Sequence, residues 1–314
     1  MNNFKKVGLT ALAGSLLATS AYAGAMSVAG SASIGVKNNS GSSTHGKSWT
    51  MGNQLTFSGS GETDGGINVS LSFVLDQGDD STTGIANAPF DSHSLTLSTD
   101  SMGTLVFSGE GGSSAQSTLD GTAAGDIWDN GLGISSPSAS EAGNNSMMYT
   151  LPSLMDDLTV QASYSPGGAG GPSASAIGFT YAGIDGLSVS YGAGQTETVG
   201  SEADATTVKG SYAYGSFTFG LSQTDYDRDS GNDDEVQSWN VSYTVTDDLS
   251  VSYGSETHST GGSTTDEEVD GFTASYTSGG MTLSAKAIEA SGVDHTAGAA
   301  GEKERWAISA SFAF

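Results

Sequence analysis

The sequence ends in Arg305-Trp306-Ala307-Ile308-Ser309-Ala310-Ser311-Phe312-Ala313-Phe314, a run in which large apolar residues alternate with small or polar ones. A two-residue period is that of a β-strand, because successive side chains point to opposite faces of a sheet. One face of this strand carries Trp306, Ile308, Phe312 and Phe314, and the other is mostly serine and alanine. This pattern predicts the closing strand of a transmembrane β-barrel, with an aromatic side chain at the membrane interface.

The first 23 residues have the features of a secretory signal peptide. Lys5 and Lys6 are basic, residues 7–18 form a short apolar stretch, and residues 21–23 read Ala-Tyr-Ala, which suits a cleavage site. The apolar stretch is shorter than the roughly 20 residues that a transmembrane helix needs. We therefore expect an exported protein whose barrel domain is residues 24–314. No other apolar run is long enough to span as a helix, so a membrane crossing would use strands.

The composition suits a barrel with a hydrated interior. The chain of 314 residues has no cysteine, 46 glycines and 36% hydrophobic residues, which is little for a large water-soluble core. A polar lumen explains this content, whereas disorder, the alternative for an acidic Gly/Ser-rich chain, conflicts with regular strands that contain Trp, Tyr and Phe. Without Lys5 and Lys6, seven of the nine basic residues remain against 35 acidic ones. This excess disfavours nucleic acid as a partner and attracts cations.

Sixteen alternating segments can be counted along the chain, and bacterial single-chain barrels have an even number of strands. The segments are residues 28–36, 49–59, 67–75, 94–99, 103–109, 146–151, 158–164, 175–182, 187–194, 206–214, 216–224, 236–245, 249–255, 269–277, 281–290 and 304–314. Tight turns alternate with longer acidic or Gly/Ser-rich stretches, among them residues 110–145, 195–204 and 225–234. The alternation predicts an antiparallel barrel with short periplasmic turns, long extracellular loops and an aqueous channel.

Several of these stretches, taken in order, resemble Gram-negative general porins, which are sixteen-stranded and usually trimeric diffusion channels. Residues 49–75 resemble the second hairpin of that family, residues 103–109 the strand before its long third loop, and residues 145–152 the strand after it. Each motif is loose, but their order covers the chain that follows the signal peptide. The resemblance implies a homotrimer in the outer membrane of a Gram-negative bacterium, with the third loop folded into the pore.

The stretch that matches the third loop, residues 110–145, is acidic and has no basic residue. The resemblance places its five acidic side chains at the pore constriction, although a solvated loop tip is the alternative; they are Glu110, Asp120, Asp126, Asp129 and Glu141. The family commonly has arginines on the wall that faces this loop, including one shortly before the Asn-Ser pair. Here residues 141–144 read Glu-Ala-Gly-Asn, so that positive group is missing. Few positive charges predict a preference for cations.

Strand parity places four basic side chains on the inner wall: Lys37, Lys209, Lys286 and Arg305. The first, fifteenth and sixteenth strands are neighbours when the barrel closes, so Lys37, Lys286 and Arg305 could form a basic patch. They could equally be isolated solvated charges, or pair with loop acids and hold the loops in place.

Asp225, Asp227 and Asp229 alternate like the first ligands of an EF-hand loop. However, position 12 of such a loop would be Val236 and no helices flank the stretch, so weak Ca²⁺ binding and a plain acidic hairpin tip are both open.

Catalytic motifs are lacking in the sequence. His45, His93, His258 and His295 lie in or beside loops without the spacing of metal ligands, and there is no G-x-S-x-G or G-x-G-x-x-G motif. We therefore expect neither an enzyme nor a cofactor other than the possible loop-bound Ca²⁺.

The sequence thus predicts a passive channel for small hydrophilic solutes and ions, with a mild cation preference, in contact with outer-membrane lipid. The alternatives are a substrate-specific channel on the same scaffold, a non-transporting acidic barrel for adhesion or structure, and a soluble secreted β-protein. Gly30 and Ala32 are small residues on the outer face of the first strand, where we expect contact with another subunit.

Overall fold

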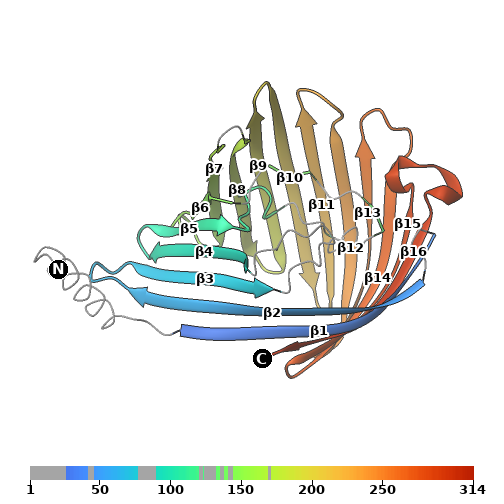
Figure 1. The fold of residues 1–314 in the computed structure, drawn as a ribbon, viewed down its shortest axis with the longest axis horizontal. Coiled ribbons are helices and arrows are strands. Elements are labelled where there is room, and N and C mark those ends of the chain that lie inside the picture. The colour runs from blue at the N-terminus through green and yellow to red at the C-terminus, as the bar shows by residue number, and fades with distance from the viewer. Residues whose placement is uncertain are drawn as a thin grey trace, which may run out of the picture.

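The structure is a computed structural model that describes residues 26–41, 46–76, 90–119, 123, 132–134, 138–140, 144–168 and 171–314. Within these residues, sixteen antiparallel strands form one closed barrel, in which each strand pairs with its neighbours in sequence and β1 pairs with β16 (Figure 1). This confirms the predicted fold. The predicted signal peptide lies outside the described residues and stays a prediction.

The strands are β1 (Met26–Ser40), β2 (Gly46–Glu62), β3 (Asn68–Asp76), β4 (Phe90–Thr99), β5 (Gly103–Glu110), β6 (Ser146–Thr150), β7 (Leu158–Ser165), β8 (Ser173–Ile184), β9 (Leu187–Thr198), β10 (Ser201–Tyr214), β11 (Phe217–Arg228), β12 (Asp234–Thr246), β13 (Leu249–Thr260), β14 (Glu267–Ser278), β15 (Met281–Ser291) and β16 (Lys303–Ala313). Two short 3-10 helices, η3 (Val293–His295) and η4 (Gly298–Ala300), lie between β15 and β16. No helix in the described part of the chain is long and apolar enough to span a membrane.

The outer face of the barrel carries the large apolar side chains. On β16, Trp306, Ile308 and Phe312 are 36%, 54% and 42% exposed. Aromatic rings on adjacent strands stack there, as in the Phe57–Phe73 pair, whose ring centroids are 5.1 Å apart. Rings at directly paired positions add about 0.2–1 kcal/mol each to strand pairing. An exposed apolar band of this kind suits contact with lipid.

The inner face carries most of the buried residues, and many of them are polar. Thr207, Thr224 and Ser238 are buried on β10, β11 and β12, while apolar residues gather in one small cluster around Val269 and Ile288. This distribution is opposite to that of a soluble protein, because the described residues of the barrel form no large apolar core.

Two of the predicted loops are shorter than expected. β9 and β10 run through the predicted loop of residues 195–204, so that Val199 and Gly200 alone connect them, and β11 and β12 continue to Arg228 and from Asp234. The tall hairpin β9–β10 stands above its neighbours in Figure 1. Where both faces of a hairpin are polar, the alternation of apolar and polar residues disappears although backbone pairing continues. A strand end that is predicted from this alternation therefore lies several residues before the end of the strand in the structure.

Candidate functional site

The third loop, between β5 and β6, begins by turning against the inner wall. The backbone N–H of Ala115 donates to Ser163 Oγ on β7 (2.8 Å), and Gln116 Nε2 donates to Thr207 Oγ1 on β10 (2.9 Å). Ala115 and Gln116 are fully buried. Because these side chains lie on the face opposite to the apolar band, the start of the loop lies inside the barrel, as predicted.

Glycines on the wall make room for this approach. A Cβ atom at Gly192 would lie 3.1 Å from Gln116 Cα, and one at Gly178 would lie against the carbonyl oxygen of Ala115. Further along the loop, the N–H of Ala123 is within hydrogen-bond distance of Ser222 Oγ (3.1 Å) and Ser238 Oγ (2.7 Å). From β7 to β12, glycines on the wall thus leave space for the loop, and hydroxyl groups on the wall form hydrogen bonds with it.

The loop then reaches a distant part of the wall. Lys303 Nζ, at the start of β16, donates to the carbonyl oxygen of Leu132 (2.8 Å). The Leu132 side chain packs in the cluster with Val269, Ile288 and Val293, beside the partly buried Ile134. The described parts of the loop therefore lie inside the barrel, against the wall between β7 and β16, and take up part of the lumen.

The end of the loop is fixed by polar contacts. Ser138 Oγ donates to Asp234 Oδ2 (3.0 Å), which also accepts a 2.6 Å bond from Arg228 Nη2. Ser140 donates to Gln116 Oε1 through its N–H (2.8 Å) and its hydroxyl (3.0 Å). Gln116 therefore ties the two ends of the loop to each other and to β10.

Only one of the predicted constriction acids belongs to the described residues. Glu110 is the last residue of β5, and its carboxylate lies 4.0 Å from Nδ1 of His93, with 39% of the side chain exposed. The other four, Asp120, Asp126, Asp129 and Glu141, lie outside the described residues, and their position at the constriction stays a prediction.

The predicted basic residues occupy two parts of the wall. Lys37 on β1 and Lys286 on β15 both pair with Ala307 on β16, so they lie in one row, and Arg305 pairs with Asn39 two residues further along the strands. Lys209 lies apart from them, between Ser190 and Ser222.

Lys303 and Arg228, which hold the third loop, were not predicted from the sequence. Lys303 has the same strand parity as Arg305, and Arg228 continues the parity of Ser222 and Thr224 on β11. Strand parity could have predicted that both side chains lie on the inner wall. Their partners in the third loop are far away in the sequence, so no local pattern predicts these contacts.

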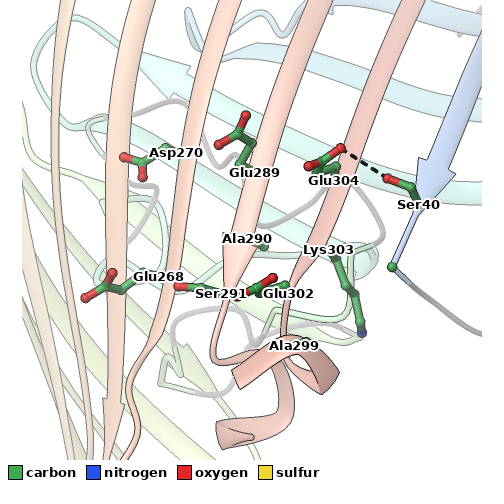
Figure 2. A pocket seen from close by; sticks show the side chains of 11 residues that line it. Ser40, Glu268, Asp270, Glu289, Ala290, Ser291, Ala299, Glu302, Lys303 and Glu304 are labelled. Atoms are coloured by element: carbon green, nitrogen blue, oxygen red, sulfur yellow. Dashed lines mark hydrogen bonds between the residues drawn. The ribbon is translucent and has the colours of Figure 1, made fainter. Parts of the chain in front are cut away.

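Acidic side chains form a row on the outer face near the long loops. Asp270, Glu289, Glu304 and Ser40 are paired in succession across β14, β15, β16 and β1. Figure 2 shows these side chains side by side, with the Ser40 hydroxyl bonded to Glu304 (3.3 Å), while Lys303 points away from them. Their parity is that of Trp306 and Phe272, so the row faces away from the lumen.

The predicted calcium ligands Asp225, Asp227 and Asp229 belong to no group of three potential metal ligands in the described part of the chain, and Ca²⁺ binding there stays a prediction. Asp225 and Asp227 belong to β11 on its outer face, and Asp225 accepts a 3.0 Å bond from Gln223. The potential metal-ligating group among the described residues is a different one, formed by His258, Glu267 and His295.

Comparison with known proteins identifies the fold and the family. The family model described as Gram-negative porin matches residues 8–282. The chain belongs to the Gram-negative porin family. Its barrel is therefore that of an outer-membrane channel. No curated protein matches the chain.

Solved structures share the fold of this porin at low sequence identity. A loop L8 deletion mutant of OmpT, an outer membrane protein of Vibrio cholerae, has a TM-score of 0.71 at 15% identity, over 92% of this chain and 99% of that one. An anion-selective porin from Comamonas acidovorans has a TM-score of 0.67 at 16% identity, over 92% and 99% of the two chains. The trimer form of Vibrio cholerae OmpT has a TM-score of 0.69 at 14% identity, over 93% and 100%.

Proposed function

We propose that this porin is a passive diffusion channel for small hydrophilic solutes and ions, with a mild preference for cations. The observation that carries the proposal is the third loop, whose described parts lie inside a lumen lined by serine and threonine and are bonded to the wall at β7, β10 and β16. A loop held at several separate points limits the size of a passing solute, while hydroxyl groups suit hydrated solutes.

The charge balance supports the preference for cations. The whole sequence has a net charge of −26, and the stretch of the third loop has acidic residues but no basic one. Two lumenal cations, Lys303 and Arg228, are engaged with the Leu132 carbonyl and with Asp234. The inner wall has four further basic residues, Lys37, Lys209, Lys286 and Arg305, whereas the stretch of the third loop alone has five acidic ones. The anion-selective porin from Comamonas acidovorans has the same fold, so the sign of the preference follows from side chains and not from the barrel.

Planar-bilayer recordings test this proposal. We expect stable conductance steps, a current that grows linearly with solute concentration, and a reversal potential in a KCl gradient that has the sign of K⁺ preference. A reversal potential of the opposite sign would contradict the cation preference. Saturation by one solute would identify a substrate-specific channel, and absent conductance would favour a non-transporting barrel.

We also propose a homotrimeric assembly. The support is the family resemblance and the trimer form of Vibrio cholerae OmpT, which has the same fold. Sedimentation of the detergent-solubilised protein, corrected for bound detergent, measures the number of chains, and a monomer would contradict the proposal.

A further inference from the structure

Three potential metal ligands meet at the long-loop end of the barrel, beside the cluster that holds Leu132. His258 on β13 and Glu267, the first residue of β14, are directly paired in the hairpin register. His295 comes from η3 in the loop between β15 and β16. One ligand atom from each of the three lies within 4.8 Å of the others. A hairpin and a separate loop thus converge on one point.

The hydrogen bonds of His295 leave one nitrogen available to a metal. Its Nδ1 lies 2.9 Å from the carbonyl oxygen of Thr265. A carbonyl oxygen only accepts hydrogen bonds, so Nδ1 carries the proton and the neutral ring has its lone pair on Nε2. A backbone carbonyl that orients the second nitrogen is the usual support of a metal-binding histidine.

His258 and Glu267 are oriented in a similar way. The Nδ1 atom of His258 faces Glu267 Oε2 at 3.0 Å, and its Nε2 lies 3.4 Å from Thr260 Oγ1, whose hydroxyl donates to Asp234. The other oxygen of Glu267 accepts the N–H of Asp294 (2.9 Å). The two atoms that face the common point, His258 Nδ1 and Glu267 Oε2, are bonded to each other, and a metal ion would replace the proton that they share; the remaining polar atom of each side chain is bonded elsewhere.

A buried His258–Glu267 pair that only stabilises the hairpin would not need a third ligand. Yet the His295 ring lies 5.6 Å from the His258 ring, centroid to centroid. Asp294 and His295 both have left-handed backbone conformations, with φ of 54° and 53°. Such conformations are uncommon in residues other than glycine, although Asp and His adopt them more readily than most, and they cluster at functional sites. In this loop they bring in the second imidazole.

We propose that His258, Glu267 and His295 bind a divalent transition metal, with Zn²⁺ as the best-suited ion. Two imidazoles and one carboxylate are typical zinc ligands, whereas Ca²⁺ and Mg²⁺ prefer sites made of oxygen atoms alone. The side chains of His258 and Glu267 are only 6% and 1% exposed, so a bound ion would be shielded from bulk water. The ion would connect η3 to the β13–β14 hairpin, and Val293 of η3 contacts the cluster around Leu132.

Isothermal titration of the full chain tests the site. The protein is expressed without a histidine tag, folded in detergent, stripped with EDTA and titrated with Zn²⁺ in the presence of excess Ca²⁺, which occupies purely acidic sites. We expect one saturable Zn²⁺ per chain. His295→Ala and Glu267→Gln should each weaken binding by roughly tenfold or more, since even supporting residues of metal sites have effects of this size.

The matched control is His93→Ala, which removes a histidine whose Nδ1 is 4.0 Å from a carboxylate, that of Glu110. This variant should bind Zn²⁺ like the parent. Circular dichroism checks that each variant is folded, and His295→Ala is decisive because the residue lies in a loop. The proposal is overturned if the folded parent takes up no Zn²⁺, if excess Ca²⁺ abolishes the binding, or if His295→Ala binds as tightly as the parent and as His93→Ala.

Discussion

Phe314 lies over Gly30 and completes the seam between the two ends of the barrel. The N–H of Gly30 donates to the carbonyl oxygen of Phe314 (2.7 Å), and the N–H of Phe314 donates to that of Gly30 (2.9 Å). The aromatic ring occupies the place where a side chain at position 30 would begin. We expected Gly30 to contact another subunit because it is small. Within the chain, its small size is explained by the Phe314 ring, which needs the space that a side chain at position 30 would fill.

A side chain at position 30 should disturb this seam. Gly30→Val would collide with the Phe314 ring and lower the free energy of unfolding by about 1–3 kcal/mol, as overpacking commonly does. Urea titration of the barrel in lipid vesicles measures the change. Gly59→Val on β2 is the matched control, because no atom lies within 4 Å of a Cβ built there. Equal stability of the two variants would contradict the role of the Phe314 ring.

Lys303 should restrain the third loop. Lys303→Met removes the bond to the Leu132 carbonyl, so we expect larger or more variable single-channel conductance. Lys286→Met is the control, since it removes the same charge from the adjacent strand. Both variants should shift the reversal potential toward cations, but only the first should change the spread of conductance. A similar spread in both would show that Lys303 acts through its charge alone.

Gln116 should hold the two ends of the third loop together. Gln116→Leu leaves Thr207 without that donor and Ser140 without its acceptor, which costs about 1–3 kcal/mol for buried polar groups. We expect faster hydrogen exchange in residues 114–119 and 138–140, while the strands stay protected. Gln223→Leu, whose amide bonds only to the nearby Asp225 among the contacts described, is the control and should exchange like the parent. Unchanged exchange in Gln116→Leu would refute this role.

The outer acidic row should reduce stability at low salt. Glu289 is directly paired with Asp270 on one side and with Glu304 on the other, and like charges at such positions repel each other. Glu289→Gln should raise the free energy of unfolding by up to about 1 kcal/mol, and salt should diminish the gain by screening. The control is Asp64→Asn in the turn between β2 and β3. An effect that does not depend on salt would argue against repulsion as its cause.

The membrane-facing part of the molecule was predictable from local sequence. The alternation that ends at Phe312 places Trp306 and Ile308 on one face, and the same period recurs in all sixteen strands. Strand ends above the apolar band were not predictable, as β9 and β10 show. Both faces of that hairpin are polar, so the sequence lacks the contrast that marks a strand.

The site was predictable only in outline. The length and order of the third loop indicated that it would enter the barrel, but the contacts of Gln116 with Thr207 and of Lys303 with Leu132 join residues 91 and 171 positions apart. His258, Glu267 and His295 had no recognisable spacing for the same reason, because two of them meet through strand register and the third through a loop that folds over the hairpin.

The barrel, its strand number, its inner and outer faces and its negative charge could all be predicted from the amino-acid sequence. Each of these properties follows from the two-residue period of a strand or from composition, which are local quantities. Three features became visible only in the folded chain: the side chains that hold the third loop, the ring that covers Gly30 and the histidines that meet Glu267. These contacts depend on the closure of the barrel, which brings residues from distant strands and loops together around one lumen.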